Sequence, residues 1–110
     1  MATAKDFIDF ASGQIAEAGA VSFKKMFGEY MIYCDGKPVF LVCDNTVYVK
    51  MLPEVSALFS DFGITPETGT PYKGAKPHYI LDIENGGFSA EMARLLARIL
   101  PMPKSKSKKK

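Results

Sequence analysis

The fold is decided by residues 24–51, which read KKMFGEYMIYCDGKPVFLVCDNTVYVKM. Two runs rich in β-formers, Tyr30–Cys34 and Val39–Cys43, flank Asp35-Gly36, a dipeptide typical of tight hairpin turns. A second turn-type dipeptide leads into a third such run, Thr46–Met51. The stretch therefore predicts three consecutive antiparallel strands.

Helical periodicity appears on both sides of these strands. Apolar residues recur at helical spacing over Ala4–Ala18, behind a capping box formed by Thr3 and Asp6. A short helix is predicted over Glu54–Phe62, and a last one from an N-cap at Ser89 to the break at Pro101.

Part of the segment between the last two helices alternates between residues that would face the core and residues that would face away from it. His78–Ile83 predicts a strand, and a second short strand is expected near Tyr72, after a loop over Thr65–Thr70. The order α-β-β-β-α-β-β-α predicts an α+β fold with two layers, an antiparallel sheet with helices on one side.

Length and charge define one domain and a tail. The 110 residues suit a single domain over 1–103, and residues 104–110 are predicted to be disordered because they have nothing to bury. Residues 1–103 hold nine Lys and Arg against 12 Asp and Glu, a net charge of −3. The tail is a candidate for weak, unspecific contact with nucleic acid, through Lys104, Lys106, Lys108, Lys109 and Lys110.

Composition argues against several classes of protein. No apolar run approaches the roughly 20 residues that span a bilayer, and the N-terminus lacks the pattern of a secretory signal, so a cytoplasmic location is expected. The cysteines, Cys34 and Cys43, lack metal or redox spacing, and His78 is the one histidine. No metal and no cofactor are predicted. The hairpin register places the two thiols roughly 20 Å apart, so they are expected to stay reduced.

The turns also predict which residues share a face of the sheet. Two-residue turns place Met31, Phe40, Val42, Val47, Val49 and Met51 on one face, which is expected to be the helix-covered core. The other face is then unusually apolar and is a candidate surface for a protein partner or a homodimer, unless a helix or loop covers it. Its members are Tyr30, Ile32, Val39, Leu41 and Tyr48, with Cys34, Cys43 and Lys50. A register error of one residue would exchange the faces.

Three motifs together resemble the N-terminal domain of TfoX/Sxy competence regulators: Lys25-Met26-Phe27-Gly28, Tyr33-x-Asp35-Gly36 and Val47-Tyr48-Val49-Lys50. The likeness runs from the first helix to about Ile83, and its signature residues are Met26, Phe27, Gly28 and Tyr30. The resemblance implies a compact α/β unit and a role in regulating DNA-uptake genes beside a DNA-bound activator. The chain departs from the family in having Met31 where glycine is frequent, and it is expected to lack the second, C-terminal domain of the two-domain members.

No group in the chain forms an evident catalytic set. Met26-Phe27-Gly28 reads as the structural start of the sheet, with a ligand role as the alternative. Glu29 could act as a general base but has no apparent acid, nucleophile or metal beside it. His78 and the basic loop Lys73–Pro77 read as surface features. The sequence therefore predicts a small non-enzymatic regulatory or interaction domain. The alternative is a small-ligand-binding protein or minor enzyme with a pocket near Gly28 and Glu29.

Overall fold

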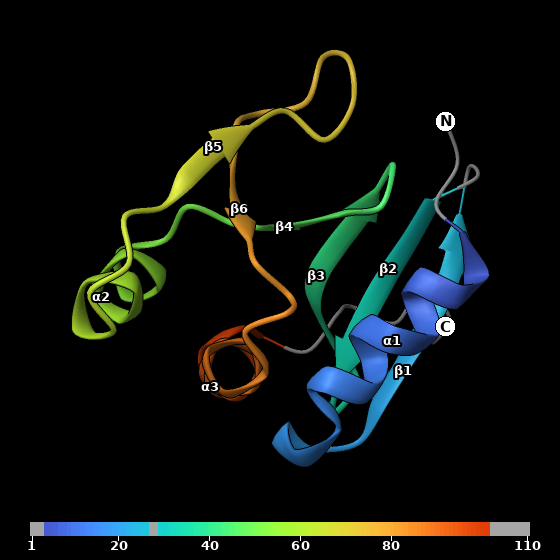
Figure 1. Ribbon diagram of the computed structural model, residues 1–110, viewed down its shortest axis with the longest axis horizontal. Coiled ribbons are helices and arrows are strands. Elements are labelled where there is room, and N and C mark those ends of the chain that lie inside the picture. Colours follow the sequence, from blue (N-terminus) through green and yellow to red (C-terminus); the bar gives the residue numbers. More distant parts are fainter. Residues whose placement is uncertain (1–3, 27–28, 102–110) are drawn as a thin grey trace, which may run out of the picture.

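The computed structural model describes residues 4–26 and 29–101, which form one antiparallel sheet with helices packed against it (Figure 1). The elements are α1 (Lys5–Gln14), a 3-10 turn η1 (Ala16–Ala18), β1 (Val21–Met26), β2 (Glu29–Cys34), β3 (Lys37–Cys43), β4 (Thr46–Val49), α2 (Pro53–Asp61), β5 (Glu67–Gly69), β6 (His78–Leu81) and α3 (Gly86–Ile99). The six strands lie in the order β1-β2-β3-β4-β6-β5. The predicted α+β class is confirmed.

The three helices lie on one face of the sheet, and the core fills the space between them and the strands (Figure 1). From the helices, Ile8, Ile15, Phe59, Met92 and Leu96 are almost fully buried. From the strands, the core takes Tyr30, Ile32, Cys34, Val39, Phe40, Val42, Val47, Val49 and Leu81. Alternate residues of β2 and β4 therefore point into the core, as the pleat of a half-covered sheet requires.

Both tight turns that define the hairpins adopt left-handed backbone at their two central residues. The φ angles are +54° and +83° at Asp35 and Gly36, and +52° and +58° at Asp44 and Asn45. This pattern matches the twist of the flanking strands, and Asp, Asn and Gly adopt it at least cost. The two-residue turns that the sequence predicted are thus present.

The register of β2 against β3 differs from the prediction because β3 contains a bulge. Cys34 lies opposite Lys37 as expected, but Ile32 lies opposite Phe40, so that Val39 is an extra residue without a partner. The one-residue shift turns Tyr30 and Ile32 to the helix-covered side and Met31 to the other side. The predicted division of β2 between the two faces was wrong for this reason.

Other differences are local. β1 was not predicted, and the expected strand near Tyr72 is instead β5, within the segment taken for a loop. α1 ends at Gln14, with η1 completing the connection. α3 begins three residues before Ser89, because Asn85 Oδ1 accepts the Phe88 amide and acts as the N-cap. Ala4 is the N-cap of α1, and Thr3 lies outside the described residues.

Candidate functional site

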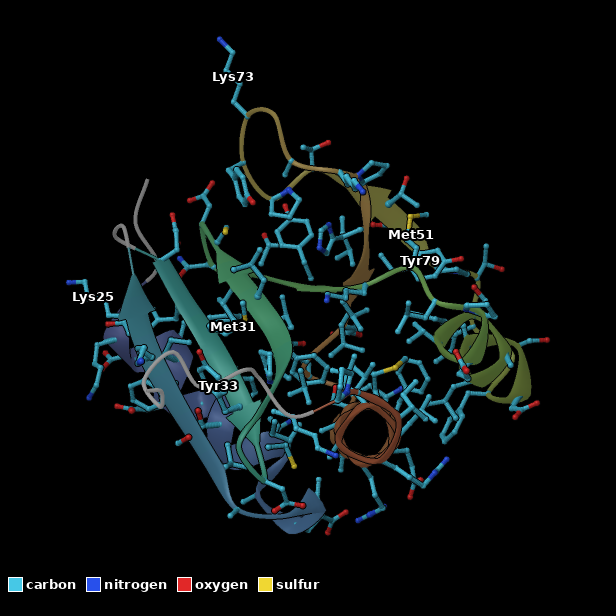
Figure 2. All side chains as sticks on the ribbon, turned by 180° about the vertical axis from the view of Figure 1, so that it is seen from behind. Lys25, Met31, Tyr33, Met51, Lys73 and Tyr79 are labelled. Atoms are coloured by element: carbon cyan, nitrogen blue, oxygen red, sulfur yellow. The ribbon has the colours of Figure 1, made fainter. Side chains whose placement is uncertain are left out.

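Among residues 4–26 and 29–101, no helix lies on one face of the sheet, and we call this face the open face. Directly opposed residues share a face, so the pairings of Met31 with Lys24 and Leu41, of Leu41 with Tyr48 and of Tyr48 with Ile80 trace one row across it. By alternation the open face also includes Tyr33, Lys50 and His78. Figure 2 looks onto it, with Met31 and Tyr33 in front of the sheet.

A shallow hollow of about 220 Å³ lies on the open face. Met31, Leu41 and Tyr48 contribute to its floor, and Tyr72 reaches it from the loop between β5 and β6. Tyr72 is 61% exposed, more than any other large apolar or aromatic side chain among the described residues. The rings of His78 and Tyr48 are nearly perpendicular, with 6.4 Å between ring centroids. The open face thus presents aliphatic side chains between exposed aromatic rings.

The candidate interaction face predicted from the sequence is split by the bulge in β3. Leu41 and Tyr48 lie on the open face and are partly exposed. Tyr30, Ile32 and Val39 are buried in the core, at 7%, 0% and 4% exposure, and cannot contact a partner. Three of the five residues predicted for the interaction face therefore lie in the core, and Met31, Tyr33 and Ile80 lie on the open face in their place.

Charge is divided between the two sides of the molecule. Eight of the 12 carboxylates lie on the helices or in the link before α3: Asp6, Asp9, Glu17, Glu54, Asp61, Asp82, Glu84 and Glu91. Lys24 and Lys50 lie on the open face, and Lys73 and Lys76 lie in the loop that carries Tyr72. On this side the carboxylates are Glu29 and Glu67; Glu67 lies opposite Ile80 on the edge strand and also borders the larger hollow described next. Four of the nine Lys and Arg in residues 1–103 thus lie on the open face or in the loop beside it, and the other five lie elsewhere: Lys5, Arg94 and Arg98 on helices, Lys25 on the helix side of β1, and Lys37 bonded to the Ala97 carbonyl of α3.

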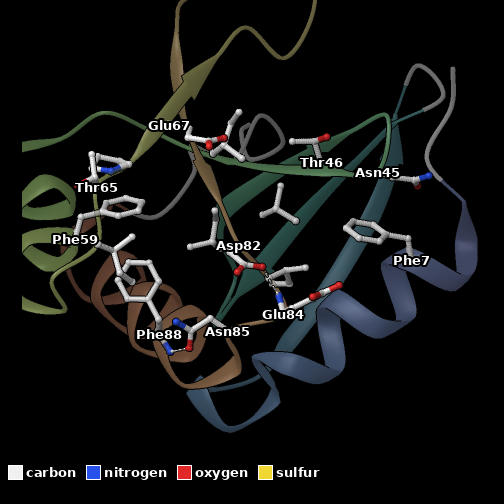
Figure 3. A pocket seen from close by; sticks show the side chains of 16 residues that line it. Phe7, Asn45, Thr46, Phe59, Thr65, Glu67, Asp82, Glu84, Asn85 and Phe88 are labelled. Atoms are coloured by element: carbon white, nitrogen blue, oxygen red, sulfur yellow. Dashed lines mark hydrogen bonds between the residues drawn. The ribbon is translucent and has the colours of Figure 1, made fainter.

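A larger hollow of about 580 Å³ lies on the helix side, between α1 and the N-terminal end of α3, and we call it the groove (Figure 3). Phe7 projects from α1 on one side, while Phe59 and Phe88 stand on the other. Phe59 and Phe88 pack edge to face, with 5.0 Å between ring centroids. The apolar floor is completed by side chains such as Val47, Ile64 and Leu81.

The rim of the groove is polar and acidic. Glu67, Asp82 and Glu84 line it, together with Asn45 and Asn85, and none of the described lining residues is Lys or Arg. The segment before α3 is held in place by local bonds: Asp82 Oδ1 accepts the Glu84 amide, and Gln14 Nε2 donates to the Ile83 carbonyl at 2.9 Å. The groove walls are therefore fixed relative to α1. Sequence reasoning missed this site because its lining residues come from segments far apart in the sequence.

The signature residues have a structural place where they are described. Tyr30 is buried and its ring meets Phe23, with 5.6 Å between centroids. The backbone of Met26 pairs with Glu29 at the end of β1. Phe27 and Gly28 lie outside the described residues.

Glu29 anchors the β3–β4 turn. Its Oε1 accepts the Asp44 amide at 3.1 Å, across 15 residues of sequence. Glu29 lines neither of the two hollows described above. Its carboxylate thus has a structural task, which lowers the case for a ligand pocket beside Gly28 and Glu29.

Both cysteine thiols are buried and free. Burial, helped by the carboxylates of Glu29 and Asp44, raises the pKa of Cys43 to about 11. Burial also raises the pKa of the Cys34 thiol, with Asp35 adding to the effect. Both thiols are therefore protonated at neutral pH, the state in which cysteine is least nucleophilic.

The remaining predicted features are surface elements. His78 Nδ1 lies 2.8 Å from the Lys76 carbonyl, which fixes the ring on the open face. Lys73 points away from the tip of its loop (Figure 2). In the described part of the chain, no group of three or more His, Cys, Asp and Glu could hold a metal ion, and no helix is long and apolar enough to cross a bilayer. The tail lysines lie outside the described residues.

Comparison with known proteins agrees with the resemblance noted above. The family model of the TfoX N-terminal domain matches residues 13–85. Over 111 aligned positions, the chain is 33% identical to a protein of Spirochaeta aurantia described as an uncharacterized 12.7 kDa protein in the trpE 5′ region. The alignment covers 99% of this chain and 93% of that protein, so the two match over nearly their whole length.

Proposed function

The chain belongs to the TfoX N-terminal domain family, a family associated with competence regulation, and from this premise we propose that it is a small non-enzymatic regulatory domain that binds another protein through the groove. The link to transcription or competence control is part of the proposal. The observation that carries the protein contact is the groove itself, with apolar rings below and carboxylates above.

The chemistry of the groove defines the partner segment. Burying an apolar side chain between Phe7 and Phe88 removes apolar area from water, which contributes about 25 cal/mol per Å². Glu67, Asp82 and Glu84 around the opening favour Lys or Arg beside that anchor, and charge complementarity of this kind raises association rates and selects partners. We therefore expect a partner segment with an apolar anchor flanked by basic residues.

Capture of the partner by matched variants tests the proposal. The tagged full-length chain is expressed in its native cell and purified as wild type, Glu84→Lys, Phe7→Ala and Asp61→Lys. Asp61 ends α2, is exposed and does not line the groove, and a lysine there suits the helix C-terminus. The partner is expected with the wild type and Asp61→Lys and is expected to be lost from the two groove variants. Equal capture by all four, or capture by none, contradicts the proposal.

A small apolar ligand is the second candidate, because about 580 Å³ falls within the range of small-molecule sites. Native mass spectrometry of the freshly purified chain separates the two candidates. A bound species below about 1 kDa that is absent from Phe7→Ala favours the ligand. A bare chain that captures a protein favours the regulatory domain.

A further inference from the structure

The open face combines aromatic rings and cations on a surface that none of the described helices covers. Tyr33 on β2, Tyr48 on β4 and His78 on β6 are each partly exposed, and Tyr72 is mostly exposed beside them. Strands lie about 4.8 Å apart and Tyr33 is two residues along β2 from the row of Tyr48, so the two residues are separated by roughly 12 Å across the sheet. Between them, Met31 and Leu41 form a flat aliphatic floor.

The cations stand around these rings. Lys24 lies at the β1 edge, opposite Met31, and Lys50 follows Tyr48 on the same face and lines the hollow. Lys73 and Lys76 extend this charge along the β5–β6 loop. These four lysines face two carboxylates on the same side, Glu29 and Glu67, so the open face and its loop carry a net charge of 4 − 2 = +2 although residues 1–103 carry −3.

The charge distribution decides which occupant suits the face. A second copy seated face to face would bring together two surfaces that each carry this net positive charge, and like charges at an interface are costly. A double helix offers only phosphates and groove edges to a flat sheet, and its bases stay stacked inside. A single strand offers phosphates to the lysines and unstacked bases to the rings, the combination used by sheet-based binding domains.

We propose that the open face binds single-stranded nucleic acid. Tyr33, Tyr48 and His78 stack against bases, and Lys24 and Lys50 hold the backbone phosphates. The site is separate from the groove and from the lysine tail, so it goes beyond the protein-binding function proposed above. Stacking of this kind is tolerant of sequence, and binding is expected to weaken as salt rises.

Fluorescence anisotropy of the full-length chain with a labelled oligothymidylate of about 20 nucleotides tests this site. Tyr48→Ala is expected to weaken binding about tenfold, since stacking of one base is a major part of such affinity. Lys24→Glu is expected to weaken it about three- to tenfold at low salt and to flatten the salt dependence between about 50 and 200 mM KCl. A duplex of the same length is expected to bind more weakly and to be insensitive to Tyr48→Ala.

Lys25→Glu is the matched control. Lys25 is the next residue on β1, is exposed like Lys24, and pairs with Tyr30 on the helix side. The charge change is identical, so a loss confined to Lys24→Glu places the strand on the open face. A second control replaces all five tail lysines by Gln at full length. This variant is expected to bind oligothymidylate more weakly than the wild type, and adding Tyr48→Ala is expected to weaken its binding further by the same factor.

Three results would overturn the inference. Binding that disappears with the tail lysines and ignores Tyr48→Ala would mean that the tail alone attracts the strand. Equal losses in Lys24→Glu and Lys25→Glu would mean unspecific attraction to net charge. Light scattering that shows a dimer in the wild type and a monomer in Leu41→Asp would mean that a second copy occupies the face.

Discussion

At the scale of single residues, Asp35 stabilises the first hairpin in two ways. Its backbone is left-handed, and its Oδ1 accepts the Ala20 amide at 2.9 Å. Asp35→Ala removes the acceptor and puts a less tolerant residue at positive φ, so the free energy of unfolding is expected to fall by about 1–2 kcal/mol. Asp35→Asn keeps both properties, and its loss in urea unfolding is expected to stay below about 0.5 kcal/mol. Equal losses in the two variants would argue against this account.

Cys43 makes stability depend on alkaline pH. Its pKa in the folded chain is about 11, above the ordinary thiol value of about 8.5 expected after unfolding. Because the pKa of the thiol is higher in the folded chain, the folded state keeps the proton at pH values where the unfolded chain has lost it. The resulting stabilisation is complete below the unfolded pKa and is lost as pH rises toward 11. The test is urea unfolding at about pH 8 and at about pH 10.5, on either side of the ordinary thiol pKa. Between these two pH values, the free energy of unfolding is expected to fall more for the wild type than for Cys43→Ala. Parallel losses would mean that Cys43 has no part in the pH dependence.

At the scale of elements, the bulge in β3 determines which residues of β2 are buried. Ile32 is fully buried and Met31 is on the open face. Ile32→Ala is therefore expected to cost about 2–4 kcal/mol of unfolding free energy, because it leaves a cavity in the core. Met31→Ala is expected to cost less than about 1 kcal/mol. Chemical denaturation of both variants compares adjacent residues of one strand, and the reverse order of losses would mean a register without the bulge.

Sequence patterns predicted the elements better than their register. Asp35-Gly36 and Asp44-Asn45 specify tight turns by residue type, and both turns are present. The bulge could not be read from the pattern because Val39 and Phe40 are both apolar, and either can satisfy a core position. β1 was missed although Val21 and Phe23 alternate with polar residues, since Lys24-Lys25 interrupts the alternation at an edge strand. The groove was missed because it depends on how α1 and α3 diverge, which no local pattern encodes.

At the scale of the whole molecule, the sheet separates two surfaces of opposite character. The groove has an acidic rim and lies among the helices, while the open face with its loop has a small excess of lysines and is covered by none of the described helices. The packed core between them includes Phe40, Val42 and Val47, all almost fully buried. Surface substitutions on opposite sides of such a core share no contacts, and effects of distant, independent sites add to within about 0.5 kcal/mol.

The two proposed binding activities should therefore be lost independently. Glu84→Lys is expected to abolish capture of the protein partner and to change oligothymidylate affinity less than about twofold. Lys24→Glu is expected to do the opposite, because its side chain lies across the sheet from the groove. The double variant is expected to show both losses, each as large as in the corresponding single variant. Loss of both activities in either single variant, in a chain that circular dichroism shows to be folded, would mean that one shared surface serves both partners. Loss of one activity alone would leave the other proposal intact, because each rests on its own face of the sheet.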